Sequence, residues 1–185
     1  LARLSLPSVL LICGSLRAGS TNAAVLQTAL AVAPDGIACR AYEGLDRLPH
    51  FNPDDDWDPL PPAVVELRAS IAAADAVLFC TPEYAGALPG SFKNLLDWTV
   101  GGGEMYAKRV AWINASGLPT GAADAHASLR KVLGYLATEI VEEACAHVPV
   151  PRQAVGDDGL IADPQLRARI ADVLRALAER STPAP

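Results

Sequence analysis

Short apolar runs alternate with helix-like stretches along most of the chain, and this alternation limits the fold more than any other feature. Four runs have the length of buried strands and a fifth is weaker: 8–13, 37–42, 76–81, 109–114 and a segment within 144–150. Between them apolar residues recur at helical spacing: 20–33, 62–73, 89–98, 122–137 and 164–177. This alternation is typical of α/β folds, so we predict a five-stranded parallel sheet of order 2-1-3-4-5 with helices on both faces.

The composition is that of a globular domain. The chain has 185 residues, 51% of them apolar, and no linker divides it, which predicts a single domain over 1–185. The formal charge is −6 and no basic stripe is present, so we expect no nucleic-acid partner. No apolar run approaches the ~18 residues of a membrane span, and residues 1–11 lead into the first strand without a cleavage site. Four cysteines without a CxxC spacing predict buried thiols in a reducing cytoplasm.

The predicted strand order places three polar loops close together. In the order 2-1-3-4-5 the chain reverses direction between strands one and three, and a crevice opens there at the carboxyl ends of the strands. The loops 15–22, 82–88 and 116–121 follow the first, third and fourth strands. We therefore expect them to form one site.

The first of these loops has the chemistry of an anion site. Between the strand and the helix lie Gly14 and Gly19, one arginine (Arg17) and several hydroxyl or amide side chains. Glycines allow backbone N–H groups to turn inward, and a helix N-terminus adds about half a positive charge. Ser20 stands where a triphosphate-binding loop has lysine, and Leu16 breaks the dinucleotide pattern GxGxxG. A single terminal phosphate is therefore the predicted ligand.

Two motifs carry a resemblance to a known family. Residues 14–22, GSLRAGSTN, resemble the GSxRxxSxN motif of the NADPH-dependent FMN reductases, a flavodoxin-like group that includes quinone, azo-dye and chromate reductases. Thr81-Pro82-Glu83-Tyr84, followed by 89–90 and 93–98, is similar to the second motif of the same family, TPEYNxSxPGxLKNxxDW. The resemblance spans nearly the whole chain and implies a flavodoxin-like three-layer sandwich.

The resemblance implies two cofactors, FMN and NADPH, and a set of binding residues. The first loop would contact the FMN phosphate, the second the isoalloxazine ring, and the loop after the fourth strand would add further contacts. The residues are Ser15, Arg17, Ser20, Thr21, Asn22, Pro82, Glu83, Tyr84, Ala85, Gly86, Ser116 and Gly117. Ala85 and Ala87 depart from the family pattern, which has asparagine and serine there, so those side-chain contacts are not expected. Arg17 can serve either the FMN phosphate or the phosphates of NADPH.

The implied activity is hydride transfer from NADPH to flavin and on to free flavin, a quinone or another small acceptor in a ping-pong cycle. This chemistry belongs to the cofactor, so we predict no catalytic acid or base. One alternative is a non-enzymatic flavodoxin-like electron carrier, against which Arg17 and the moderate net charge argue. Another is a related module that has lost its flavin. The resemblance also implies a homodimer or homotetramer, with 88–98 as a contact element.

Several polar and aromatic residues outside these loops have simpler interpretations. Trp98 and Trp112 are expected in the core or an interface, and Lys93 and Asp97 are spaced to pair on one helix. The acidic run 54–56 reads as a solvated segment without metal. Finally, His126 is expected on the exposed face of its helix, and Glu83 either as a solvated loop charge or as a partner for a helix at a subunit contact.

Overall fold

The computed structural model describes residues 6–179 and confirms the predicted sheet. Its strands run in the order β2-β1-β3-β4-β5, and all neighbours are parallel. β6 pairs with the last two residues of β4, past the part of β4 that pairs with β5. The strands are β1 (Ser8–Cys13), β2 (Ala38–Tyr42), β3 (Ala76–Cys80), β4 (Arg109–Asn114), β5 (Glu139–Ile140) and β6 (Ala146–His147). The register pairs Cys13 of β1 with Cys80 of β3, so these two strands end at the same level.

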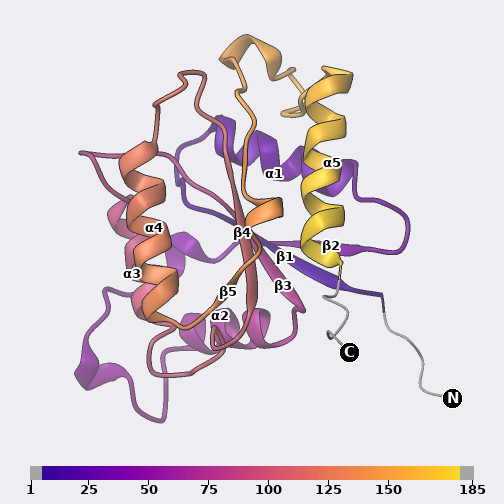
Figure 1. The fold of residues 1–185 in the computed structure, drawn as a ribbon. Helices are drawn as coiled ribbons and strands as arrows, with labels where there is room; N and C mark the ends of the chain where they lie inside the picture. Colours follow the sequence, from indigo (N-terminus) through magenta and orange to yellow (C-terminus); the bar gives the residue numbers. More distant parts are fainter. Residues whose placement is uncertain (1–5, 180–185) are drawn as a thin grey trace, which may run out of the picture.

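Helices cover both faces of the sheet. They are α1 (Thr21–Ala31), α2 (Pro62–Ala72), α3 (Gly90–Asp97), α4 (Ala123–Tyr135) and α5 (Pro164–Ala178). Figure 1 shows α1 and α5 on one side of the sheet and α3 and α4 on the other. One core packs α2, α3 and α4 against the sheet, while a second packs α1 and α5 against its opposite face. The strands alternate between these cores: Leu10 faces the first and Leu11 the second.

The last helix begins as its sequence predicts. The Asp163 carboxylate accepts hydrogen bonds from the backbone N–H groups of Gln165 and Leu166, at 2.7 and 3.2 Å. Pro164 occupies the first helical position, where no N–H is needed. An N-cap carboxylate followed by proline therefore defines this helix start.

The prediction for the fifth strand is only partly right. The outer edge of the sheet is split: β6 lies inside the expected segment 144–150, but β5 precedes it at Glu139–Ile140. A short 3-10 helix, Glu142–Ala144, separates the two and buries Ala144 in the core. Each piece has only two residues, which is too short for an alternating pattern to be recognised in the sequence.

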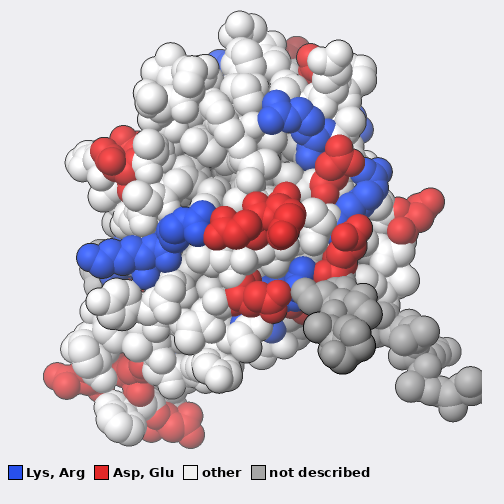
Figure 2. All heavy atoms as spheres, viewed as in Figure 1, with Lys and Arg blue, Asp and Glu red and all other residues white. Residues whose placement is uncertain are grey.

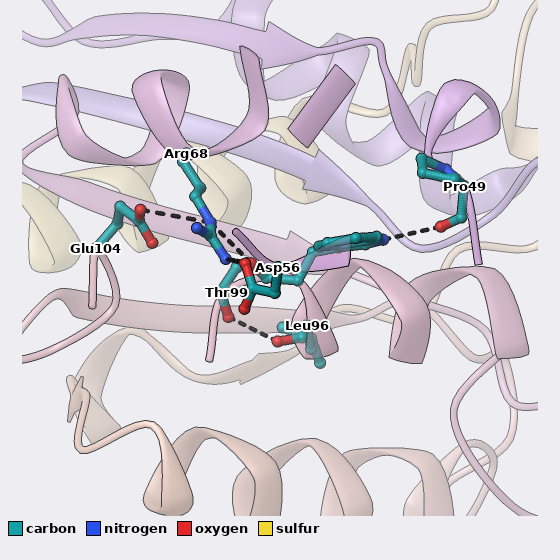
Figure 3. Close-up of polar contacts among 7 residues, drawn as sticks. Pro49, Asp56, Arg68, Leu96, Thr99 and Glu104 are labelled. Carbon is teal, nitrogen blue, oxygen red and sulfur yellow. Dashed lines mark hydrogen bonds and ion pairs between the residues drawn. The ribbon is translucent and has the colours of Figure 1, made fainter. Parts of the chain in front are cut away.

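The long segment between β2 and α2 is held by a partly buried ion network, shown in Figure 3. The Arg68 guanidinium of α2 lies 2.6 Å from an Asp56 oxygen and 3.7 Å from a Glu104 oxygen, and all three side chains are only 12–13% exposed. It also donates to the Trp98 carbonyl at 2.8 Å. The prediction of a solvated acidic run is therefore wrong for Asp56, because the arginine that pairs with it stands 12 residues further along the chain.

Two hydrogen bonds to the Pro49 backbone carbonyl also hold the segment between β2 and α2. The Trp98 indole N–H and the Asn94 amide both donate to the Pro49 carbonyl, at 2.8 and 2.9 Å. Trp98 is fully buried and Trp112 nearly so, as expected. Lys93 and Asp97 form the predicted pair at 2.6 Å.

The surface mixes the two signs of charge. Acidic and basic side chains lie next to one another over the face seen in Figure 2, in keeping with pairs such as Arg109 with Glu139 and Arg130 with Glu142. Within residues 6–179, no helix is both long and apolar enough to cross a bilayer.

Candidate functional site

The carboxyl ends of β1, β3 and β4 surround a cavity of about 460 Å³. β1 and β3 are drawn tightly together there, because the Gly14 N–H donates to the Cys80 carbonyl at 2.9 Å. A Cβ on residue 14 would lie 2.3 Å from the Thr81 hydroxyl, so only glycine fits. The lining residues are Thr21, Asn22, Thr81, Pro82, Glu83, Asn114, Ala115, Ser116, Gly117, Ala122, Val150, Pro151 and Arg152.

The N-terminus of α1 faces this cavity with its donors open. Ser20 is the N-cap residue, yet its side chain makes no capping hydrogen bond. In residues 6–179 no acceptor is found for the backbone N–H groups of Thr21, Asn22 and Ala23. Unpaired amides at the start of an 11-residue helix point toward this cavity and have the geometry that suits an anion.

Asn22 is oriented by the neighbouring strand. The Cys80 thiol donates to the Asn22 side-chain oxygen, with 3.2 Å between sulfur and oxygen. Burial raises the pKa of the Cys80 thiol well above its ordinary value, so it keeps the proton that it donates. With its oxygen occupied, Asn22 has its amide NH₂ group left to donate to a ligand.

The remaining residues of the first loop point elsewhere. The Arg17 guanidinium donates to the Gly19 carbonyl at 3.2 Å, and the Ser15 hydroxyl accepts from the Arg17 N–H at 3.3 Å. Neither residue lines the cavity, and Arg17 is exposed. The loop thus uses these side chains to hold its own shape.

The loop after β3 forms a tight turn at the rim. Tyr84 and Ala87 exchange backbone hydrogen bonds of 3.0 and 3.1 Å, and the two central residues, Ala85 and Gly86, have φ of 52° and 70°. Positive φ at both central positions defines a type I′ turn, which favours Asn-Gly and places Ala85 under strain. Tyr84 is 50% exposed at this turn.

Glu83 connects this loop to α4. Its carboxylate accepts from the Ala125 N–H at 3.0 Å, so it caps the N-terminus of a helix that follows a different strand. Neither predicted interpretation of Glu83 is right: it is a helix partner, but of α4 in its own chain and not at a subunit contact.

Three hydrogen bonds hold the loop after β4. The Asn114 side chain donates to the Gly121 carbonyl and accepts from the Ser116 N–H, both at 2.9 Å. A ring nitrogen of His147 lies 2.7 Å from the Ser116 carbonyl oxygen. Ser116 and Gly117 are therefore fixed at the cavity wall.

His126 was expected on the exposed face of α4, and that prediction is wrong. It is 8% exposed, packs beside the Trp112 ring, and its Nδ1 lies 2.7 Å from the Ala122 carbonyl oxygen. Its Nε2 is buried without a partner in the described part of the chain. Burial lowers the pKa of His126 below 6.5. The helical pattern misled because the loop holding Glu83 covers this end of α4.

The structure gathers half of the predicted site residues at one cavity. Thr21, Asn22, Pro82, Glu83, Ser116 and Gly117 line it, whereas the other six lie in the same loops outside its wall: Ser15, Arg17, Ser20, Tyr84, Ala85 and Gly86. Sequence reasoning missed Asn114 and Arg152. Asn114 ends a predicted strand, as cavity residues often do, but nothing in the sequence indicates Arg152.

The strand order and the cavity at its carboxyl edge define a flavodoxin-like α/β protein. Within that class, the family model for NADPH-dependent FMN reductase matches residues 7–150, and the chain belongs to this family.

Individual relatives agree in sequence and in structure. The chain is 35% identical over 171 residues to the NAD(P)H-dependent FMN reductase PA1204 of Pseudomonas aeruginosa, covering 91% of this chain and 92% of that one. It is 31% identical to a probable NADPH:quinone oxidoreductase 2 of Oryza sativa, covering 90% and 84%. Among solved structures, the flavoenzyme FerB, an NAD(P)H:acceptor oxidoreductase from Paracoccus denitrificans, superposes with a TM-score of 0.79 at 29% identity, covering 92% and 97%.

Proposed function

We propose that the chain binds FMN at the carboxyl edge of β1, β3 and β4 and reduces a small acceptor, a quinone or free flavin, with electrons from NADPH. Relatives named as FMN and quinone reductases support this activity. The observation that carries the proposal is the open N-terminus of α1 beside Asn22 and the cavity. The alternative, a non-enzymatic carrier, has no support among these relatives.

The residues present fit a flavin mononucleotide. Amide donors of α1 and Asn22 suit the terminal phosphate, and the cavity of about 460 Å³ lies in the usual range for small-molecule sites. Pro82 and the fixed segment 114–117 supply a rigid wall for the ring, and the turn at Tyr84 stands at its rim. We extend the proposal to Ser15, Arg17, Ser20, Ala85 and Gly86 as residues that shape the two loops.

The chain's own part in the reaction is binding and orientation. FMN, when bound, would supply the chemistry of hydride transfer between NADPH and the second substrate. The α1 amides and Asn22 would hold its phosphate at this end of the cavity. Tyr84, half exposed, offers an apolar surface next to an open approach, so that nicotinamide and acceptor can enter in turn.

Flavin binding and turnover test the proposal directly. Purified protein titrated with FMN should quench flavin fluorescence to an end point of one FMN per chain, and the complex should oxidise NADPH with a quinone or free FMN. Asn22→Ala should weaken FMN binding, whereas Asn52→Ala, which alters a cap in the segment before α2, should not. Failure to take up FMN would favour a module that has lost flavin, and uptake without turnover would favour a carrier.

We also propose a homodimer or homotetramer in which a second copy covers the groove between α3 and α4. That groove, about 700 Å³, is bordered by the exposed side chains of Val100, Tyr106 and Tyr135. Burying them would remove apolar surface from water. Light scattering should give at least twice the chain mass, and Tyr135→Glu should lower it. A monomer would contradict this part of the proposal.

One domain over 1–185 and a cytoplasmic location complete the proposal. All four cysteines are free, in keeping with a reducing compartment. Limited proteolysis that yields one resistant core, and fractionation of the source cells, test these two statements.

A further inference from the structure

The charges at the cavity wall are few. Of the residues that line it, Arg152 is the one basic side chain and Glu83 the one acidic side chain. Glu83 is occupied, because its carboxylate accepts from the Ala125 N–H at the start of α4. Arg152 is exposed and, within residues 6–179, its guanidinium makes no hydrogen bond or ion pair. The cavity therefore has one uncommitted charge, and it is positive.

The arginine of the first loop does not fill this role. Arg17 donates to the Gly19 carbonyl inside its own loop and does not line the cavity. Arg152 instead shares the cavity wall with Thr21 and Asn22, the first two residues of α1. The cation beside the helix amides thus comes from a segment some 130 residues away from the loop that sequence motifs identify.

The backbone on both sides of Arg152 is fixed. The N–H groups of Val148 and Val150 donate to the carbonyls of Asn114 and Ala115, at 2.9 and 3.2 Å, which extends the pairing along β4. Beyond Arg152, the buried Ile161 N–H donates to the Thr28 hydroxyl of α1 at 3.0 Å. Figure 1 shows this segment rising at the same end of the sheet as the loop between β4 and α4. Arg152 is therefore an exposed side chain whose backbone is held on both sides.

The donors of α1 alone leave a phosphate monoester only partly neutralised. Such a group carries nearly two negative charges at neutral pH, whereas helix amides supply about half a positive charge and Asn22 supplies none. A guanidinium adds a full charge and can donate two parallel hydrogen bonds to phosphate oxygens.

We propose that Arg152 binds a phosphate monoester at the mouth of this cavity, together with the N-terminus of α1. The inference rests on the proposed function, which supplies two sources of this chemistry: the 5′-phosphate of FMN and the 2′-phosphate of NADPH. In either case Arg152 determines which nucleotide is accepted, since riboflavin and NADH lack the group that it recognises.

Arg152→Ala tests this, with Arg175→Ala, an exposed arginine of α5 outside the cavity lining, as the matched control and circular dichroism as the check of folding. Arg17→Ala is the competing variant, because Arg17 belongs to the first loop. Binding of FMN and riboflavin is measured by fluorescence, and KM is measured for NADPH and NADH. If FMN is the source, Arg152→Ala raises the Kd for FMN at least about tenfold and leaves that for riboflavin within about twofold. If NADPH is the source, the KM for NADPH rises by a similar factor, while FMN binding and the KM for NADH stay unchanged. Arg152→Lys recovers part of either loss.

Two results separate this inference from the proposed function. An Arg152→Ala protein that matches the wild type for all four ligands, or an Arg17→Ala protein that loses more affinity, would overturn it while FMN binding stands. If the wild type fails to bind FMN, the proposed function fails, and inorganic phosphate becomes the probe. Phosphate should then raise the melting temperature of the wild type and not that of Arg152→Ala; equal shifts would overturn the inference.

Discussion

Two regions of the molecule differ in how their polar groups are paired. One is the segment between β2 and α2, and the other is the set of loops at the carboxyl ends of β1, β3 and β4. Asp56 of the first region pairs with Arg68 of α2, which also faces Glu104, and the three side chains are only partly exposed. At the second, the amides of Thr21 and Asn22 and the Arg152 guanidinium have no acceptor within residues 6–179. In the first region the charged groups are paired with one another, whereas the donors at the cavity are left open, which indicates a ligand. Four predictions test this difference, beginning with the largest effect.

Arg68→Ala should destabilise the protein most. It leaves the Asp56 and Glu104 carboxylates buried without their countercharge, which should lower the free energy of unfolding by about 3–5 kcal/mol. Chemical denaturation measures the change. The control is Arg47→Ala, which removes an exposed pair with Glu66 and should have little effect. Equal losses in the two variants would show that the segment before α2 is not fastened by this network.

Gly14→Ala should disturb the cavity and the fold together. The new Cβ would meet the Thr81 hydroxyl at 2.3 Å and force β1 and β3 apart, at a cost of about 1–3 kcal/mol. FMN binding should weaken as well. Gly90→Ala is the matched change, because a Cβ there meets nothing within 4 Å and alanine favours the helix. A Gly14→Ala protein as stable as Gly90→Ala would mean that the strand ends can separate freely.

Ala85→Asn should relieve strain at the rim. Asparagine tolerates the left-handed conformation at this turn, so unfolding should cost up to about 1 kcal/mol more. Ala107→Asn, at another exposed residue with φ of 52°, should stabilise similarly. Only the first variant should change FMN affinity, because only residue 85 belongs to the cavity rim. If Ala107→Asn changes FMN affinity as much as Ala85→Asn, the effect comes from general stability and not from the cavity rim.

His126 should give the smallest effect, seen as a dependence on pH. Its pKa in the folded protein is lower than the unfolded value of 6.5, so the unfolded state binds the proton more readily. Stability should be unaffected above pH 6.5 and should fall as the pH drops below it. His126→Gln should flatten this part of the curve in denaturation experiments at pH 5 to 8. An unchanged slope would show that His126 is not held neutral by burial.

Much of the fold could be predicted because its information is local. The apolar run of β1, the proline at the start of α2 and the Asp163 cap of α5 each involve neighbouring residues, and all appear in the structure. The divided outer edge could not be predicted, because two-residue strands depend on pairing with β4 and not on any pattern of their own.

The sequence by itself indicated the alternation of strands and helices and the loops that follow the strands, because hydrophobic periodicity and loop chemistry are properties of short segments. The order of the strands was inferred from that alternation and is confirmed by their pairing. Only the tertiary structure decided which charged side chains are paired within the protein and which are left unpaired at the cavity. Asp56 and Glu83 are taken up by Arg68 and by the start of α4, and His126 is buried under a loop from another strand. Arg152 reaches the cavity from the far end of the chain. The reason is physical: an ion pair, a burial or a cavity depends on distances between segments, which no local pattern records.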